Sequence, residues 1–430
     1  MIRWRIGKFI AGALAAAMLL AACGSEASET PTGENEKSNE PVTLTMWARS
    51  VTAPQSEALV ERFNNEHDGE IKIELTVVPF QEYLQKVSAA ASGGNLPDLL
   101  AANVIDGANY SALGLWADIT EKIQALPFSA ELAPAHLEVA SRDNAIFAVP
   151  HVVDTSALYY NKVLFERAGL DPEAPPTTLN EVHDAAQKIS ALEDADGMYF
   201  PGDCGGCLAF TVFPSIWADG GGVLNDGGTE SLLDSQSSKD TFAVYHEMWN
   251  DGSMARESRN ETGATQNTAF ESGAVGMALL GSKALATLAE NDVLDIGVTP
   301  IPGVNGGKST FVGGDIVGIS SNSEHVDAAW KFLAWTLDEQ VQLDVYAKDG
   351  YIPVRTDLAN NKYAAEDPRV QMFNELVADG QLPYSPRFFQ TFNDPQGPFM
   401  VLVREAVFGS GPGSLTETNK AVNESLQASF

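Results

Sequence analysis

Alternation of apolar and polar residues predicts several short strands near the start of the chain. The pattern VTLTMW repeats with period two, as half-buried strands do, whereas Leu59, Val60 and Phe63 share one helical face. The predicted elements here are a strand at 42–47, a helix at 54–67, a strand at 71–78, a helix at 81–92 and a strand at 97–104. This order predicts an α/β fold with parallel strands, in which ligands bind beyond the carboxyl ends of the strands.

The same two periodicities continue to the C-terminus. Thr178 and Glu181 form a capping-box pattern that begins a helix, and Pro214 suits only a first helical turn. The further elements are a strand within 146–165, a glycine-bracketed strand at 273–282, a helix at 324–348 with a core stripe at Val326, Trp330, Leu333 and Leu337, and two or three final helices. The chain beyond residue 41 is long enough for two or three domains.

Residues 301–310, IPGVNGGKST, end like a nucleotide-phosphate loop. That loop needs four residues between its glycines and lies between a strand and a helix. Here only three residues separate Gly303 from Gly307, and the following STFVGGDIVGIS alternates as a strand. Because Gly-Gly suits a hairpin turn, we predict a turn between two strands and no nucleotide binding.

The N-terminus has the features of a secretory signal. Arg3, Arg5 and Lys8 precede an apolar run of 12 residues, which is too short to span a bilayer but fits a signal peptide. Leu20-Ala21-Ala22-Cys23 resembles the lipobox of bacterial lipoproteins, in which the peptidase cuts before a cysteine that carries diacylglycerol. We therefore predict a lipoprotein signal peptide at 1–22 and lipidation of Cys23.

The segment after Cys23 is polar and acidic. Residues 24–40 contain five Glu and no aliphatic residue larger than Ala, so the segment cannot bury enough apolar surface to fold. We predict a disordered tether at 23–40, with a lipid anchor on the extracytoplasmic face as the only membrane contact.

The body of the chain is strongly acidic. Cleavage before Cys23 removes three of 26 basic residues and no acidic one, which leaves 23 basic and 58 acidic residues and a net charge of −35. Nucleic-acid binding depends on Lys and Arg neutralising phosphates, so the charge argues against a nucleic-acid partner.

Two further cysteines form the motif DCGGC. Cys204 and Cys207 could form a disulfide, a redox centre or half of a zinc site. No second pair or nearby His cluster accompanies them, which disfavours a metal, and YFPGDCGGCLAF reads as a loop rather than the helix start typical of thioredoxin-like chemistry. We favour a structural disulfide, with a redox pair or free thiols as alternatives.

Several segments together resemble a known family. These are LYYNKVLFERAGL (158–170), IWADGGGVL (216–224), DIGVTPIPG (295–303), FVGGDIVGIS (311–320) and AKDGYIPVRTDL (347–358). They are similar to family 1 extracellular solute-binding proteins, the sugar-binding lipoproteins of ABC importers related to maltose-binding protein. The resemblance runs in order from about Pro41 to the C-terminus.

The resemblance implies a two-lobed periplasmic-binding-protein fold, with hinge-connected doubly wound α/β sheets and a ligand cleft between the lobes. It implies lobe 1 at 41–152 and 315–352 and lobe 2 at 155–311 and 356–430. It also implies a monomer without cofactor or enzymatic activity, which captures a carbohydrate, an oligosaccharide by preference, and delivers it to permease subunits.

Aromatic rings cover the flat C–H faces of sugars, and Asp, Asn and Arg bind hydroxyls by charge-assisted hydrogen bonds. Positions after strand ends, or matching cleft positions of the family, give the candidate ligand contacts Trp47, Arg49, Ser50, Asn103, Asp106, Asp154, Phe210, Gly281, Ser282, Asp315, Arg387 and Phe389. The two glycines before Asp315 would let the backbone approach a ligand.

Some of these candidates also have a structural explanation. Trp47 suits a core position, Asp106 a helix N-cap, and Phe210, Phe213 and Trp217 one packed helix face. Arg387 with its neighbours suits an ordinary packed loop.

Two other classes of function stay open, namely the binding of a solute other than a sugar and the hydrolysis of glycosides. A member of the same family could bind a polyamine, an opine-like solute or a glycerol phosphoester, although a phosphate would need more basic residues than Arg49 and Arg387. A secreted glycosidase could use two carboxylates, yet no nucleophile motif is present.

Overall fold

The computed structural model describes residues 41–79 and 82–428. The predicted signal peptide at 1–22, the lipidation site Cys23 and the tether at 23–40 lie outside the described residues. They stay predictions.

Two lobes share one continuous set of strands in the order β2-β1-β3-β12-β6-β8-β7, with β9 also paired to β6. In the first lobe, β1 is parallel to β2 and β3, while β12 is antiparallel to β3. In the second lobe, β7 is parallel to β8, and β8 and β9 are antiparallel to β6. The strands are β1 Val42–Arg49, β2 Ile71–Val78, β3 Leu99–Asn103, β6 Val149–Asn161, β7 Asp196–Tyr199, β8 Val275–Gly281, β9 Ile296–Thr299 and β12 Val312–Ile319, with two small hairpins β4 Ser141–Arg142 with β5 Ala145–Ile146 and β10 Ile301–Gly303 with β11 Gly306–Ser309.

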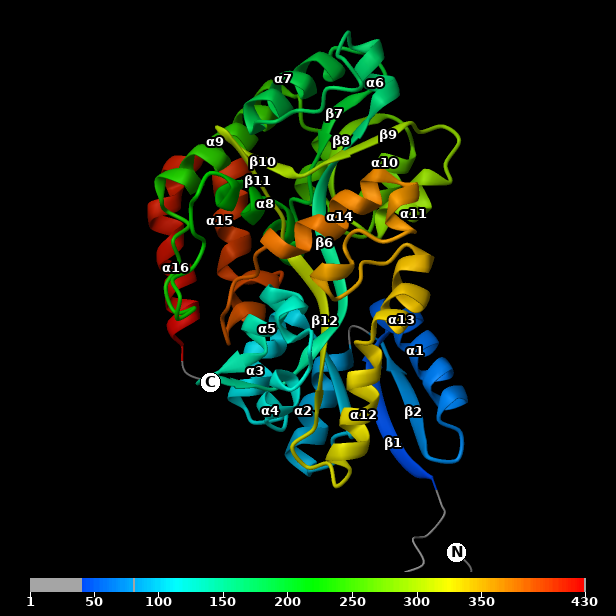
Figure 1. The fold of residues 1–430 in the computed structure, drawn as a ribbon. Helices are drawn as coiled ribbons and strands as arrows, with labels where there is room; N and C mark the ends of the chain where they lie inside the picture. The colour runs from blue at the N-terminus through cyan, green and yellow to red at the C-terminus, as the bar shows by residue number, and fades with distance from the viewer. Residues whose placement is uncertain (1–40, 80–81, 429–430) are drawn as a thin grey trace, which may run out of the picture. The chain divides into compact units, whose positions relative to one another are not determined.

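The lobes are joined by β6 and β12, which run side by side through the middle of Figure 1. The first half of β6 pairs with β12 from Val149 to Thr155, and its second half pairs with β8 from Ser156 to Tyr160. One strand therefore belongs to both lobes, which is the arrangement of a hinge. An isolated bridge between Val153 and Ile352 brings a third segment of chain to the same place.

Helices cover the sheets of both lobes (Figure 1). Near the foot of the view, α1, α2 and α12 surround β1 and β2, and near its head α6 and α7 lie by β7. The α-helices are α1 Ala53–Glu66, α2 Tyr83–Gly93, α3 Gly107–Ala112, α4 Thr120–Gln124, α5 Pro134–Val139, α6 Lys162–Arg167, α7 Leu179–Ser190, α8 Gly205–Ala218, α9 Gln236–Asp251, α10 Gln266–Glu271, α11 Ala284–Ala289, α12 Val326–Thr336, α13 Glu339–Val341, α14 Pro368–Asp379, α15 Pro398–Phe408 and α16 Leu415–Gln427.

Most local predictions are confirmed. The strands and helices expected between residues 42 and 104 are present as β1, α1, β2, α2 and β3. Thr178 and Glu181 form the capping box that starts α7. The glycine-rich loop is a hairpin turn, because Ile301 pairs with Ser309 and Gly303 with Gly306.

The predicted helix at 324–348 is wrong as a single element. It breaks after Thr336, and Asp338 adopts an extended conformation with ψ 142° before α13. The side chain of Gln342 donates to the carbonyl of Thr336 at 2.6 Å, which satisfies a helix-end carbonyl. Of the predicted core stripe, Leu333 and Leu337 are fully buried, while Val326 and Trp330 pack against the core and stay partly exposed.

Two predictions around α8 are also wrong. The DCGGC motif starts a helix rather than lying in a loop, because Cys204 is the N-cap of α8 and Cys207 is in its first turn. Pro214 lies inside α8, beyond the first turn. The helix tolerates it within a run that is buried from Thr211 to Trp217, so tertiary packing outweighs the lost backbone hydrogen bond.

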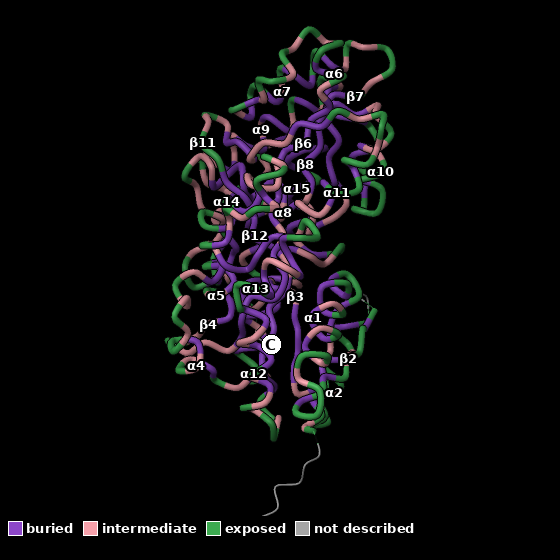
Figure 2. The backbone as a smooth tube through the Cα atoms, turned by 45° about the vertical axis from the view of Figure 1, so that its right-hand side comes forward, coloured by how far each residue is buried: buried purple, intermediate pink, exposed green. Residues whose placement is uncertain are grey.

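Buried residues follow the strands of both lobes, and exposed residues follow the outer loops (Figure 2). Among the described residues, none of the helices has both the length and the apolar character needed to cross a bilayer. The predicted residue bounds of the two lobes stay a prediction.

Candidate functional site

A cavity of about 400 Å³ opens where the two lobes meet at the hinge. Its walls come from the ends of β1 and β3, from β12 and β6, and from the starts of α8 and α11. The lining residues are Arg49, Val51, Thr52, Asn103, Val104, Ile105, Asp154, Gly206, Cys207, Phe210, Lys283, Phe311, Gly313, Gly314, Phe388 and Asn393.

Arg49 lines the cavity on the side of the first lobe and forms a buried ion pair with Asp315 behind it. The Nε of Arg49 donates to Oδ1 and Oδ2 of Asp315 at 3.0 and 3.2 Å, and its Nη2 also contacts Oδ1. Arg49 is 5% exposed and Asp315 is not exposed at all. Burial lowers the pKa of Arg49, but the attraction of Asp315 and the hydrogen bonds to it outweigh burial and raise this pKa. The pair therefore fixes a charged guanidinium at the cavity.

A smaller cavity of about 110 Å³ adjoins this wall and contains Asp106. Asp106 is 8% exposed, and burial raises the pKa of its carboxyl from 3.8 to about 7, partly offset by Arg49. Its side chain does not cap α3, although it occupies the N-cap position. Tyr83, Asn103 and Phe389 line the same space.

Polar residues of the hinge and the second lobe form the opposite side. Ser282 donates from its hydroxyl to Oδ1 of Asp154 at 2.7 Å. A Cβ placed on Gly281 would lie 3.0 Å from Oδ2 of Asp154, so glycine leaves room for that carboxylate. Lys283 follows directly and lines the cavity. Asp154 thus faces the cavity while Ser282 holds one of its oxygens.

Aromatic rings form the side of the cavity near α8. Phe210 and Phe311 line it with their ring centroids 5.5 Å apart, and Trp217 lies 5.9 Å beyond Phe311. Phe213, on another side of α8, is fully buried and packs against Phe392 and other aromatic side chains. The spacing of Phe210, Phe213 and Trp217 therefore gives one residue at the cavity and two in the core.

Glycines bring the backbone of β12 against the cavity. Gly314 has φ +115°, and a Cβ there would overlap the carbonyl oxygen of Val152. A Cβ on Gly313 would lie 3.1 Å from the ring of Phe210. The glycines before Asp315 line the cavity, whereas the Asp315 carboxylate points to Arg49.

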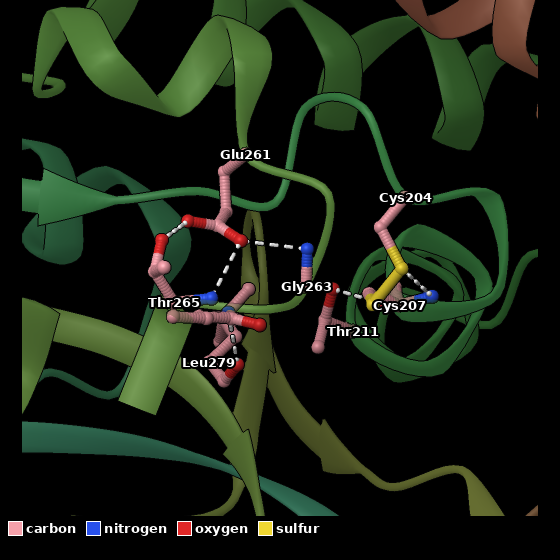
Figure 3. The surroundings of a disulfide bond; sticks show 8 residues. Cys204, Cys207, Thr211, Glu261, Gly263, Thr265 and Leu279 are labelled. Atoms are coloured by element: carbon pink, nitrogen blue, oxygen red, sulfur yellow. Dashed lines mark hydrogen bonds between the residues drawn. A yellow bond between two sulfur atoms is a disulfide. The ribbon is translucent and has the colours of Figure 1, made fainter. Parts of the chain in front are cut away.

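A disulfide joins Cys204 and Cys207 at the start of α8. Figure 3 shows the loop from Glu261 to Thr265 beside the sulfur atoms. Cys207 also lines the cavity. The pair therefore belongs to the wall of the candidate site.

The structure brings seven of the predicted residues to the two cavities. Arg49, Asn103, Asp154, Phe210 and Cys207 line the main cavity, and Asp106 and Phe389 line the smaller one with Arg49 and Asn103. Cys204 is linked to the main cavity only through its disulfide.

The other predicted residues lie elsewhere. Trp47 packs on the core beneath the ammonium of Lys86, whose Nζ is 4.3 Å from the ring centroid. Arg387 donates from Nε to the carbonyl of Ser425 in α16 at 3.3 Å. Ser50, Gly281, Ser282 and Asp315 adjoin cavity-lining residues but do not themselves line the cavity.

Sequence reasoning missed Lys283, Phe311, Asn393 and several apolar lining residues. Lys283 directly follows the predicted ligand contacts Gly281 and Ser282, so extending that pair by one residue would have included it. Asn393 carries no local signal, because its place in the cavity depends on how a distant segment packs against α8.

Comparisons with known proteins give one consistent result. A family model described as bacterial extracellular solute-binding protein matches residues 58–372. A binding protein of Brucella abortus is 28% identical over 393 residues, which cover 87% of this chain and 88% of that protein. The diacetylchitobiose binding protein DasA of Streptomyces coelicolor is 22% identical over 356 residues, 80% of each chain.

The fold is also found among solved structures. The cyclic alpha-maltosyl-1,6-maltose binding protein from Arthrobacter globiformis aligns with a TM-score of 0.78 at 24% identity, over 90% of this chain and 99% of that chain. At this identity the likeness shows the fold, with two α/β lobes.

Proposed function

This chain belongs to the bacterial extracellular solute-binding protein family, and we propose that it captures a carbohydrate, an oligosaccharide by preference, for an ABC importer. The observation that carries the proposal is the cavity of about 400 Å³ at the hinge, with aromatic and hydrogen-bonding side chains on facing walls. This volume lies in the range of ligand pockets, about 300–1,000 Å³. Relatives named for diacetylchitobiose and a cyclic maltosyl-maltose support a sugar ligand.

The lining suits the chemistry of a sugar. Phe210 and Phe311 offer ring faces for C–H groups, and Arg49, Asn103 and Asp154 offer donors and acceptors for hydroxyls. Ionic hydrogen bonds of this kind contribute about 1.5–3 kcal/mol each. Both types of contact in one cavity favour a hydroxyl-rich ligand with apolar faces.

The charges of the lining argue against a polyamine. The main cavity carries one acidic side chain, Asp154, and two basic ones, Arg49 and Lys283. A polycation would need several carboxylates there. A phosphoester would need more than one available cation, yet Arg49 is already paired with Asp315.

Binding would close the lobes about β6 and β12. A ligand shifts the open and closed populations only by its different affinities for them. Residues on both sides of the cavity would contact the same ligand, which favours the closed form. The permease would then recognise loaded protein by its shape.

We propose that a lipid on Cys23 anchors the protein on the extracytoplasmic face, with residues 23–40 as the tether. Lobe 1 would then comprise 41–152 and 315–352, and lobe 2 would comprise 155–311 and 356–430. The family and its relatives are binding proteins rather than enzymes, so the ligand would leave chemically unchanged.

A binding screen tests the proposal. Purified protein is titrated calorimetrically with diacetylchitobiose, cyclic maltosyl-maltose, maltotriose, spermidine and glycerol 3-phosphate, and new reducing ends are assayed in parallel. We expect one saccharide to bind at one site without new reducing ends, and a thermal shift that reflects about 2.7 kcal/mol at 100 times Kd. Binding of spermidine alone, or turnover of a saccharide, would contradict the proposal.

A further inference from the structure

The disulfide between Cys204 and Cys207 lies at the cavity, not at the periphery of the fold. Cys207 and its neighbour Gly206 line the cavity, and Phe210 lines it three residues after Cys207. All three belong to the first turns of α8, which begins at Gly205. The position of this helix start therefore sets the position of one cavity wall.

The residues between the two cysteines are poor helix formers. Gly205 and Gly206 occupy the first turn of α8, and glycine disfavours helix more than any residue except proline. Close packing requires glycine at position 205 and leaves little room at position 206. A Cβ on Gly205 would overlap the carbonyl oxygen of Phe392, and one on Gly206 would lie 2.9 Å from Oδ1 of Asn393, the end of a side chain. Two residues that disfavour helix therefore lie at the helix start beside the cavity.

The sulfur atoms hold this helix start in two ways. Cys204 Sγ accepts a hydrogen bond from the backbone N–H of Cys207 at 3.2 Å, which caps the helix. The covalent bond closes the ring over the two glycines. Thr211 donates from its hydroxyl to the carbonyl of Cys207 at 2.7 Å and continues the ordered turn.

A loop packs against the disulfide on the side shown in Figure 3. Gly263 has φ +87°, and a Cβ there would lie 2.6 Å from Cys207 Sγ. The carboxylate of Glu261 accepts from the backbone N–H of Gly263 at 2.7 Å and of Thr265 at 3.1 Å. Tyr199 at the end of β7 donates to the same carboxylate at 2.9 Å. The loop therefore ties the sulfur atoms to the sheet of the second lobe.

We propose that the Cys204–Cys207 disulfide is a positioning element of the ligand site, which holds the glycine turn of α8 and with it the Phe210 wall. This inference rests on the proposed function. It assigns the disulfide a role in ligand affinity in addition to its role in stability. The bond restrains a helix start that contains Gly205 and Gly206, two residues that disfavour helix.

Three forms of the protein test the proposal. Cys204→Ala with Cys207→Ala removes both the bond and the cap. Cys204→Ser with Cys207→Ala restores a capping oxygen without the bond. Reduction of the unchanged protein by dithiothreitol breaks the S–S bond and places a proton on each sulfur, while the dithiol is oxidised to its own cyclic disulfide.

Each form is titrated with the saccharide that binds the oxidised protein, and amide hydrogen exchange is measured at 205–211. We expect both double variants and the reduced protein to bind about tenfold more weakly, a factor of the same order as the cost of holding one or two glycines in a helix. Exchange should accelerate at 205–211 but not in α9, and reoxidation of the reduced protein should restore affinity. Wild-type affinity in the serine variant would show that the cap alone suffices and would overturn the proposal.

A matched pair of glycine variants tests the packing separately. Gly263→Ala and Gly252→Ala place the same methyl group at similar φ values of +87° and +84°, but a Cβ on Gly252 would come no closer than 3.5 Å to its nearest neighbour, a side-chain nitrogen of Arg256. We expect only Gly263→Ala to weaken binding. Equal affinities for the two variants would contradict the role of the loop.

The outcomes separate the two proposals. If none of the saccharides binds the oxidised protein, the proposed function fails, and hydrogen exchange at 205–211 alone decides whether the disulfide holds the turn. If a saccharide binds and its affinity is unchanged by reduction, the proposed function stands and the positioning role is refuted.

Discussion

Replacement of Asp315 by Asn should destabilise the protein strongly. Arg49 and Asp315 are 5% and 0% exposed, and the carboxylate also accepts from the Thr52 hydroxyl at 2.5 Å. Asn keeps the shape of Asp but removes the carboxylate that is hydrogen-bonded to the buried guanidinium of Arg49, and leaves only more weakly interacting charges such as Asp106. Removal of one partner of a buried pair costs about 3–5 kcal/mol. Two unit charges 4 Å apart attract by about 4 kcal/mol at an effective dielectric constant of 20, which agrees in size.

Asp357→Asn provides the matched control. Arg355 donates from Nε to Asp357 Oδ1 at 3.0 Å, in a pair whose side chains are 8% and 35% exposed. The Asp357 carboxylate is partly exposed, and Arg355 also donates to the carbonyl of Leu337 at 3.3 Å, so we expect a smaller loss of about 1 kcal/mol. Urea unfolding, followed by circular dichroism and tryptophan fluorescence, measures both variants. If Asp315→Asn lowers the free energy of unfolding no more than Asp357→Asn, the Arg49–Asp315 pair is not the buried charge pair described here.

Three further predictions concern the cavity and the buried titratable groups. Phe210→Ala should weaken saccharide affinity by about tenfold or more with little loss of stability, whereas Phe213→Ala should lower the free energy of unfolding by about 3–5 kcal/mol. Calorimetric titration measures the affinity and urea unfolding the stability of each variant, and the reverse pattern would contradict the assignment of Phe210 to the cavity wall. Burial lowers the pKa values of His136 and His151 from 6.5 to about 4, so the unfolded state binds more protons than the folded state between these pH values. The two neutral imidazoles therefore contribute up to about 3 kcal/mol each to the free energy of unfolding above pH 6.5, and this contribution is lost as pH falls toward 4. Substituting both residues by Gln should flatten this part of a plot of unfolding free energy against pH. Burial raises the pKa of Asp106 from 3.8 to about 7, so the contribution of its carboxyl to the free energy of unfolding is full below pH 3.8 and is lost as pH rises to 7. The stability of Asp106→Asn relative to the unchanged protein should therefore increase across this window by up to about 4 kcal/mol. A stability difference that is independent of pH would contradict the burial of this carboxyl.

Local elements could be predicted from the sequence because their causes are local. Period-two alternation identified β1 and β2, a capping box identified the start of α7, and the spacing of Gly303 and Gly307 separated a hairpin from a phosphate loop. Each of these signals depends on residues within one element or turn.

Features that depend on tertiary packing or on individual side-chain hydrogen bonds could not be predicted in this way. Pro214 continues α8 because tertiary packing holds the helix, and the helix at 324–348 breaks where Gln342 satisfies the carbonyl of Thr336. Hydrophobic periodicity and helix propensity do not take either interaction into account. The connection of the two lobes by a hinge was expected only from resemblance to the family.

The candidate site shows the same limit. Arg49 comes after a predicted strand and Asp315 after two glycines, so each could be identified as a candidate. They are 266 positions apart, however, and nothing in the local sequence shows that they pair with each other. Their pairing moves Asp315 from the expected cavity wall into the core. Phe210 could be placed at the cavity only by family position, since periodicity groups it with Phe213 and Trp217.

Small-angle X-ray scattering with and without a saturating saccharide tests the central claim most directly. Closure of two lobes about β6 and β12 predicts a smaller radius of gyration in the loaded protein, with the saccharide recovered unchanged. An identical scattering profile at saturation, or a cleaved saccharide, would contradict it.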